Sequence, residues 1–247
     1  MKLDYQDLRW ALVRLPKNLK TIMEQKEWHE NIFVGGGYLR SIVSGEKIND
    51  VDVFVKSEKD AELLAHKLAV DKKDIYKTDN AYTVRGKMTI QIIHRWLFEK
   101  PEDVSNSFDF TICCAVIFCN GTPNHFDQET GEKEKIQIEW SSYCDDRFYV
   151  DLASKRLIYR CPVRNEDAGG SMLRVLKYYQ KGYRIPLDSL GAVIARLTKS
   201  LDCNKIDITN EDAVAKVITG LLREVDPNID PLHLSHLPSS GEEETTN

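Results

Sequence analysis

Two carboxylates one residue apart, Asp50 and Asp52, lie in the otherwise apolar segment Asp50-Val-Asp-Val-Phe-Val55. Side chains alternate across a β-strand, so both carboxylates are expected on the same side of one strand. Two like charges held together repel each other, and a shared divalent cation removes that cost. Asp50 and Asp52 are therefore predicted metal ligands. Mg²⁺ is the expected ion because it keeps positions open for phosphate oxygens.

The segment just upstream, Val34-Gly-Gly-Gly-Tyr-Leu-Arg40, is typical of a strand, a glycine turn and the start of a helix. Backbone N–H groups at a helix N-terminus suit an anionic phosphate, and glycine lets the backbone approach it closely. A glycine run alone is more often a flexible turn, and a lone Asp-x-Asp is more often part of a solvated loop. Their succession over a short stretch indicates a site for a nucleotide and its metal.

The elements that must position these residues alternate between helix and strand. Apolar residues recur at helical spacing over residues 4–26, where Pro16 is expected to break or kink the helix. Further helices are predicted at 36–44, at 58–70 with Ser57 as the cap, and at 101–105. Strands are predicted at 31–35, 51–55, 81–85 and 88–95. The apolar run 108–118 is expected to end in an Asn120-Gly121 turn, followed by a return strand near 123–127 and a loop or irregular helix over 128–147.

A second, helical part is expected from Arg164 onwards. Helices are predicted at 166–182, at 187–200, and at 210–225 with Thr209 as a cap candidate. From Pro227 the composition turns to Pro, Ser, Glu and Thr, which is typical of disorder. The predicted organisation is a mixed α/β domain over 1–163, a helical domain over 164–226 and a disordered tail over 227–247.

Length and composition exclude several classes of protein. The 247 residues can bury a sizeable core, and the charged fraction of 30% is ordinary for a globular protein. No apolar run approaches the roughly 20 residues that span a bilayer, and the first residues lack the apolar core of a secretion signal, so a cytoplasmic location is expected. The net charge of −5 argues against strong nonspecific binding of nucleic acid. Six cysteines at irregular positions indicate buried reduced thiols rather than a zinc site or a disulfide framework.

Gly36-Gly37, Arg40, Gly45 and Asp50-Val-Asp52 together resemble the signature of the polymerase-β-type nucleotidyltransferases. The likeness is to the class II branch, which contains the CCA-adding tRNA nucleotidyltransferases and bacterial poly(A) polymerases. Phe108-Asp109-Phe110-Thr111 resembles the Arg-Arg-Asp-Phe-Thr motif of this branch, and Glu166-Asp167 with the following helix resembles the start of its neck. The resemblance implies an α+β fold, with a nucleotidyltransferase head of a small mixed sheet and flanking helices over 1–163 and a helical neck over 164–226.

The chain departs from the pattern of this branch at three places. Ser41 stands where the family usually has Asp, and Ser107-Phe108 replaces the two arginines before Asp-Phe-Thr. Gly169-Gly170-Ser171 stands where a template arginine follows the Glu-Asp pair. In CCA-adding enzymes that arginine helps to select CTP and ATP, so the resemblance implies that this selection mechanism is missing. A compact relative of the kind seen in phage genomes is expected.

The resemblance implies in-line attack on the α-phosphorus of an NTP, with pyrophosphate leaving and two Mg²⁺ ions at the reacting phosphate. The catalytic residues are expected to be Asp50, Asp52 and Asp109, of which the first two bind the metals. The expected nucleotide-binding residues are Gly36, Gly37, Arg40, Ser41, Asp109, Arg174 and Lys177. Arg40 is alternatively a surface helix arginine, and Arg174, Lys177 and Lys181 are alternatively a solvated helix face.

A third carboxylate is frequent in the superfamily, and two positions are candidates for it. Asp109 interrupts an apolar run, although a strand-entry Asp that accepts backbone hydrogen bonds has the same appearance in sequence. Related class II enzymes use the equivalent Asp for the ribose of the nucleotide, so the role of Asp109 stays open. The second position, on the predicted strand 88–95, carries the neutral amide of Gln91.

The leading functional hypothesis is a Mg²⁺-dependent enzyme that transfers NMP from an NTP to an RNA 3′ end, with tRNA as the expected acceptor. A second hypothesis is transfer of AMP to a protein hydroxyl, as in small members of this superfamily from toxin–antitoxin pairs. A third is a degenerate, catalytically inactive nucleotide-binding module. Gln91 and the missing arginines favour this hypothesis. The sequence leaves the preferred base and the oligomeric state open.

Overall fold

The structure is a computed structural model that describes the chain except residues 124–135, 161–167, 200, 202–206, 208 and 226–247. The chain divides into two compact units, Met1–Val163 and Arg164–Asn247, and each is described by itself. The predicted tail 227–247 and the Glu166-Asp167 pair lie outside the described residues. No helix in the described part of the chain is both long and apolar enough to cross a membrane.

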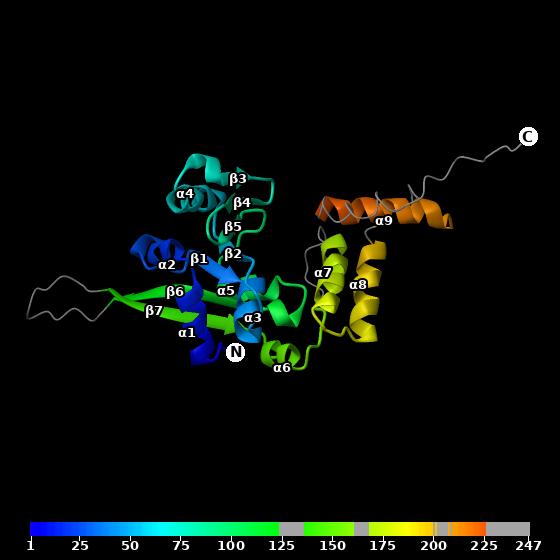
Figure 1. Cartoon of the computed structure of the whole chain (residues 1–247), viewed down its shortest axis with the longest axis horizontal. Helices are drawn as coiled ribbons and strands as arrows, with labels where there is room; N and C mark the ends of the chain where they lie inside the picture. The colour runs from blue at the N-terminus through cyan, green and yellow to red at the C-terminus, as the bar shows by residue number, and fades with distance from the viewer. Residues whose placement is uncertain (124–135, 161–167, 200, 202–206, 208, 226–247) are drawn as a thin grey trace, which may run out of the picture. The chain divides into compact units, whose positions relative to one another are not determined.

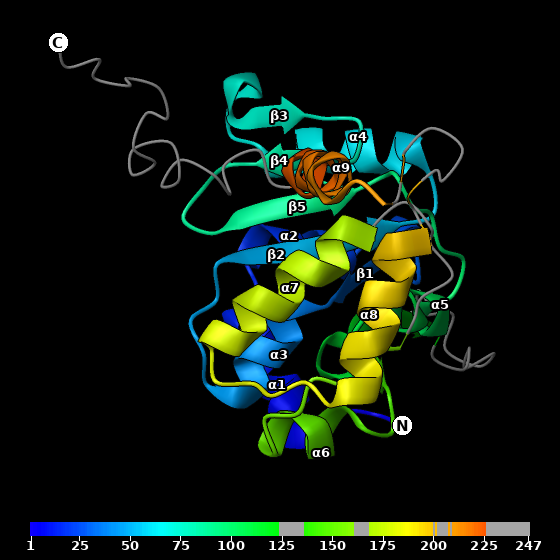
Figure 2. The same cartoon turned by 90° about the vertical axis from the view of Figure 1, so that its right-hand side faces the viewer.

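The first unit is built on a mixed sheet, whose seven described strands follow the order β3-β4-β5-β2-β1-β6-β7. The strands are β1 Ile32–Gly35, β2 Asp50–Val55, β3 Ile75–Lys77, β4 Ala81–Val84, β5 Thr89–Ile93, β6 Ala115–Pro123 and β7 Ile136–Cys144. Strand β2 pairs in parallel with β5, whereas β1 pairs antiparallel with both β2 and β6. Figure 2 shows β3, β4, β5 and β2 stacked one below the other. The predicted α+β fold class is confirmed.

Helices flank this sheet in the first unit and make up the second. Those of the first unit are α1 Tyr5–Arg14, α2 Lys17–Met23, α3 Gly37–Ser44, α4 Glu58–Leu68, α5 Pro101–Asn106 and α6 Phe148–Ala153. Those of the second are α7 Ala168–Gln180, α8 Leu187–Lys199 and α9 Glu211–Val225. Within the second unit α7 packs against α8 and α9, and Figure 1 shows α7 and α8 side by side.

The local signals for several of these elements are confirmed. Pro16 separates α1 from α2, since its ring cannot donate the backbone hydrogen bond that a continuous helix needs. The Ser57 hydroxyl caps α4 by accepting a hydrogen bond from the Asp60 amide at 3.1 Å. The cap of α9 was wrongly predicted, because the Asn210 side chain, rather than that of Thr209, accepts from the Ala213 amide at 3.1 Å.

The two faces of the sheet have different covers. Val51 and Val53 of β2 point to one face and are fully buried, and α3 and α4 both pack against β2. Phe54 points to the other face, where it forms a core cluster with Phe33, Val104 of α5 and Val116. Side chains two residues apart share a face, so the carboxylates of β2 lie on the Phe54 side. The short helix α5 therefore covers the far end of the carboxylate face.

The hairpin of β6 and β7 differs from the prediction. The Asn120-Gly121 pair lies inside β6, opposite Glu139 and Ile138, so the turn predicted there is wrong. The partner strand β7 falls within residues 128–147, which were predicted to be a loop or an irregular helix, so that prediction is wrong for Ile136–Cys144. Its sequence alternates between polar and apolar residues, and its long pairing with β6 outweighs the local turn preference of Asn-Gly. The short strand β3 was not predicted either, since three residues carry too weak a periodic signal.

The four cysteines that the structure describes, Cys113, Cys114, Cys119 and Cys144, are buried and form no disulfide with one another, as predicted for reduced thiols. Burial is the main cause that raises the pKa of Cys119 and of Cys144 to about 11. A raised thiol pKa lowers the fraction of reactive thiolate at neutral pH.

We expect these four thiols to react with a maleimide at least about 100-fold more slowly in the native protein than in denaturant, because all four are buried and the raised pKa of Cys119 and of Cys144 also lowers their thiolate fraction. Mass spectrometry of the labelled peptides would measure each site separately. Rapid labelling of Cys119 or Cys144 in the native state would contradict their burial.

Candidate functional site

The paired carboxylates stand at the start of β2, on one face. Asp50 and Asp52 are half-buried, whereas Val51 between them is fully buried, as the alternation along a strand requires. Strand β5 runs parallel beside them and places Thr89 level with Asp50 and Gln91 level with Asp52. The same-side placement predicted from the sequence is therefore present in the structure.

The glycine turn adjoins this pair. Gly36 follows β1 with φ +71° and ψ −133°, a backbone conformation that favours glycine, and it caps the N-terminus of α3. A Cβ atom on Gly36 would lie 3.6 Å from Asp52 Oδ2. In the sheet, Gly35 pairs directly with Asp52. The turn and the carboxylate thus border the same small volume.

The amide groups of the turn are used differently from the prediction. The Gly36 N–H donates to the Ala115 carbonyl at 3.2 Å, so this amide holds β1 against β6 instead of facing a ligand. The first helical hydrogen bond runs from the Arg40 N–H to the Gly36 carbonyl. The N–H groups of the first helical turn, Gly37 to Leu39, precede that bond, and N–H groups in this position at a helix N-terminus are suited to binding an anion.

Arg40 and Ser41 lie inside the first unit. Arg40 is only 4% exposed, so its alternative assignment as a surface arginine is wrong. Its guanidinium donates to Ser41 Oγ at 2.9 Å and forms an ion pair with Glu46 at 3.5 Å, and Glu46 also lies 3.8 Å from Lys155 Nζ. The Arg40 Nη1 atom lies 3.9 Å from the position of a Cβ on Gly37. A buried positive charge therefore sits directly behind the first turn of α3.

Glu46 is an ion-pair partner of Arg40 that the sequence pattern does not indicate. It follows the end of α3, where Gly45 adopts the left-handed conformation with φ +67° and reverses the chain. The Glu46 N–H then donates to the Ser41 carbonyl at 2.9 Å, which brings the Glu46 carboxylate back to Arg40. No helical or strand periodicity relates positions 40 and 46, so the Gly45 signal for a helix end was the only pointer in the sequence.

Asp109 is 4% exposed and follows Phe108, whose ring lies against the glycine turn. The Asp109 carbonyl accepts a hydrogen bond from the Arg160 N–H at 2.7 Å. Thr111 of the same motif donates to the buried carboxylate of Asp151 at 2.8 Å, and Asp151 also pairs with Arg147. The Asp-Phe-Thr motif therefore anchors the segment beside the site to α6.

Phe108 has no place in the set of site residues expected from the sequence, yet it borders the site. A Cβ on Gly36 would lie 2.8 Å from Phe108 Cε1, and one on Gly35 would lie 3.3 Å from the same ring. The signal that could have found it is its position, since it stands where the family motif has an arginine.

Whether the site can hold a metal ion depends on the carboxylate oxygens of Asp50 and Asp52. Among the described residues no group of three or more His, Cys, Asp or Glu side chains is arranged to hold a metal ion. The position level with Asp52 on β5 carries the neutral amide of Gln91. Two carboxylates on one face, next to an anion-binding helix end, suit an ion whose remaining ligands are phosphate oxygens and water. The donor set fits Mg²⁺ with a bound nucleotide.

Two of the predicted nucleotide-binding residues belong to the second unit. Arg174 is half-buried and Lys177 is exposed on α7, and Lys181 follows the end of that helix. The site described above consists of residues of the first unit alone. The roles of Arg174 and Lys177 therefore stay predictions.

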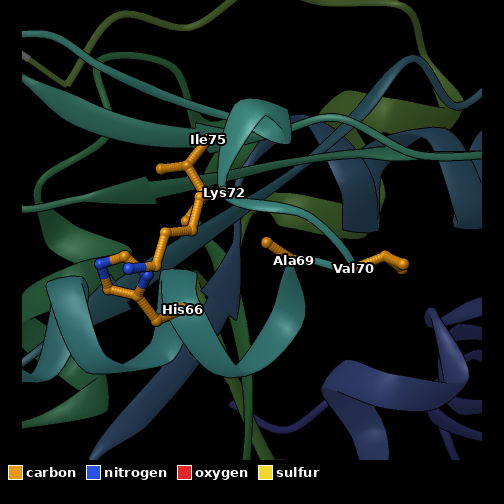
Figure 3. Close-up of a pocket in the computed structure, with 5 residues that line it drawn as sticks. All are labelled: His66, Ala69, Val70, Lys72 and Ile75. Atoms are coloured by element: carbon orange, nitrogen blue, oxygen red, sulfur yellow. The ribbon is translucent and has the colours of Figure 1, made fainter.

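A pocket elsewhere in the first unit does not contain the predicted site. It lies where α4 ends and the chain leads into β3, and Figure 3 shows the Lys72 side chain reaching toward His66. Its lining residues are His66, Ala69, Val70, Lys72 and Ile75. None is a carboxylate that could ligate a metal, and none belongs to β2, β5 or the glycine turn.

Solved structures resemble the chain in fold. The CCA-adding enzyme of Thermotoga maritima complexed with tRNA is one of them. The match covers 81% of this chain and 46% of the enzyme's chain, with a TM-score of 0.52 and 16% sequence identity. A CCA-adding enzyme in complex with ATP matches the same shares, with a TM-score of 0.54 and 17% identity. At such identities the likeness shows the fold, and the chain spans less than half the length of these enzymes.

Sequence comparison points to a phage protein family. The protein "Gabija anti-defense 2" of Bacillus phage SPbetaL7 is 29% identical over 84 residues, which cover 32% of this chain and 20% of that protein. The model of the Gabija anti-defense 2 family matches residues 13–155, more than half of the chain and nearly all of the sheet unit that carries the site. The chain therefore belongs to the Gabija anti-defense 2 family.

Proposed function

We propose that the protein is a Mg²⁺-dependent nucleotidyltransferase that transfers NMP from an NTP to an acceptor hydroxyl, in the service of a phage anti-defense role. One observation carries the proposal: the glycine turn and the Asp52 carboxylate border the same volume, with a Gly36 Cβ position 3.6 Å from Asp52 Oδ2. A phosphate cradle and a metal-binding carboxylate at that separation can act on one triphosphate. The fold of the CCA-adding enzymes supports the same reaction type.

In this proposal each element of the site has a separate task. The N–H groups of Gly37 to Leu39 bind the β- and γ-phosphates, and the buried Arg40 strengthens the positive potential behind them. Asp50 and Asp52 would hold Mg²⁺, which would neutralise charge on the transferred and leaving phosphates. The acceptor oxygen forms a bond to the α-phosphorus as the bond to the bridging oxygen of pyrophosphate breaks.

The remaining predicted residues have roles that belong to the proposal alone. Asp109 accepts a hydrogen bond from the ribose, as the resemblance to class II enzymes implies, and its place next to Phe108 supports this. Ser41 serves the site by fixing the Arg40 guanidinium through the hydrogen bond between them. Arg174 and Lys177 contact the triphosphate or the base.

An RNA 3′ end, with tRNA as the expected case, is the first candidate acceptor, and the likeness to a CCA-adding enzyme complexed with tRNA supports it. A protein hydroxyl is the second, and two observations favour it. The net charge is −5, which does not suit a polyanionic acceptor, and the family is described by its action against a defense system. A catalytically inactive nucleotide-binding module is the third, and Gln91 level with Asp52 favours it.

A labelling assay tests the proposal. The full chain is incubated with Mg²⁺ and each of four α-³²P-labelled NTPs, first with bulk RNA and then with a bacterial lysate, beside the double variant Asp50→Ala/Asp52→Ala. Label in RNA that depends on both aspartates supports the first acceptor, and label in protein supports the second. If the unaltered protein incorporates no more label than the double variant in any reaction, the proposed enzymatic activity is refuted. The hypothesis of an inactive nucleotide-binding module then remains.

A further inference from the structure

Phe108 lies at the border of the proposed nucleotide site. Its Cε1 and Cζ atoms lie 2.8 and 3.0 Å from the position of a Cβ on Gly36, and that position is 3.6 Å from Asp52 Oδ2. The ring packs edge to face on Phe54, with centroids 5.7 Å apart, and Phe54 shares the face of the carboxylates. Part of the Phe108 side chain stays exposed.

A second ring packs on Phe54 but at the other end of the strand. Phe98 lies 5.8 Å from the Phe54 ring centroid, also edge to face, and its N–H donates to the carbonyl of Val55, the last residue of β2. Asp50 and Asp52 stand at the start of β2. Phe98 and Phe108 thus make matched contacts with the same core residue, and Phe108 is the one beside the glycine turn.

The order of phosphate, sugar and base along a nucleotide determines which part of a bound NTP would contact Phe108. A triphosphate bound by the first turn of α3 and by metal at Asp52 places its α-phosphate at the carboxylate, and the ribose is attached directly to that phosphate. The sugar and base must therefore leave the site past the groups that border this point. Phe108 is a partly exposed aromatic ring among these groups, and aromatic rings hold sugars and bases by contact and stacking.

We propose that Phe108 is a nucleotide-contacting residue that binds the sugar and base of the NTP through its ring, without selecting among the four bases. This inference rests on the proposed function and deepens it. A phenyl ring offers no hydrogen-bond donor or acceptor, so it cannot read the edge of a base. Every base has a π-face, so contact with the ring tolerates all four.

Titration calorimetry with Mg²⁺ and two probes tests the inference. The probes are α,β-methylene-ATP, which carries sugar and base, and inorganic tripolyphosphate, which carries neither. We expect Phe108→Ala to weaken binding of the ATP analogue by about tenfold and to leave tripolyphosphate binding unchanged within about twofold. The same substitution should weaken binding of the α,β-methylene analogues of CTP, GTP and UTP by similar factors. Phe108→Leu, which keeps an apolar side chain against Phe54, serves if the alanine variant does not fold, and it should weaken the ATP analogue in the same selective way.

The matched control is Phe98→Ala, which removes the other ring from Phe54 and should leave the affinity for both probes unchanged. An equal loss of affinity for both probes in the Phe108 variants would overturn the inference. The ring would then only support the glycine turn that is proposed to bind the phosphates. Tighter binding of the ATP analogue would overturn it as well, because the ring would then obstruct the site. If the unaltered protein binds neither probe, the proposed function itself fails, whereas binding that ignores Phe108 refutes only this inference.

Discussion

Asp52→Asn is expected to lower NMP transfer about 10³-fold while leaving the protein folded. Asn keeps the shape of the side chain and removes the charge that holds the metal, and metal stabilisation of the transferred phosphate is worth several kcal/mol. Asp50→Asn should act in the same direction. Asp52 is half-buried beside a like charge at Asp50, so the substitution should change the free energy of unfolding by less than about 1 kcal/mol.

Two measurements separate a metal ligand from a structural residue. At a Mg²⁺ concentration of about ten times Kd, binding should raise the free energy of unfolding of the unaltered protein by about 1.4 kcal/mol, and this gain should vanish in Asp52→Asn. The exposed Asp79 in the turn before β4 provides the charge-matched control, since Asp79→Asn also removes one negative charge. Equal stabilisation of all three proteins by Mg²⁺, or retained transfer in Asp52→Asn, would refute the metal site.

Gly36→Ala is expected to destabilise the protein by about 2–4 kcal/mol and to lower transfer at least about tenfold. At φ +71° and ψ −133° the backbone lies outside the left-handed helical region that some L-residues tolerate. The new methyl group would also lie 2.8 Å from a Phe108 ring that packs on Phe54. Denaturant unfolding measures the first effect, and the labelling assay measures the second.

Gly45→Ala is the matched control for this substitution. Gly45 also has a positive φ, at +67°, but with ψ 18° it lies in the left-handed helical region, and a Cβ there would meet nothing within 4 Å. The expected cost is about 1 kcal/mol with little change in transfer. Equal destabilisation by the two substitutions would mean that the contact with Phe108 adds nothing at Gly36.

Local signals were sufficient for several elements that depend on their own residues. Pro16 ended a helix, Ser57 capped one, and the alternation around Val51 placed Asp50 and Asp52 on one side of β2. They were misleading at Asn120-Gly121, where pairing with a distant strand outweighs a strong turn preference. A turn signal reports the preference of two residues, whereas a strand pair sums the preferences of many.

The sequence by itself determined the order of the site, namely a strand, a glycine turn, a helix and a carboxylate strand, because backbone geometry over twenty residues is largely a local property. Tertiary structure decided which groups border the candidate site. It turned the Gly36 amide to Ala115, buried Arg40 with Glu46, and placed Gln91 beside Asp52 and the Phe108 ring against Gly36. Each of these contacts results from packing between segments that lie far apart in the chain, or on either side of the chain reversal at Gly45. The periodicity of a sequence does not predict such contacts.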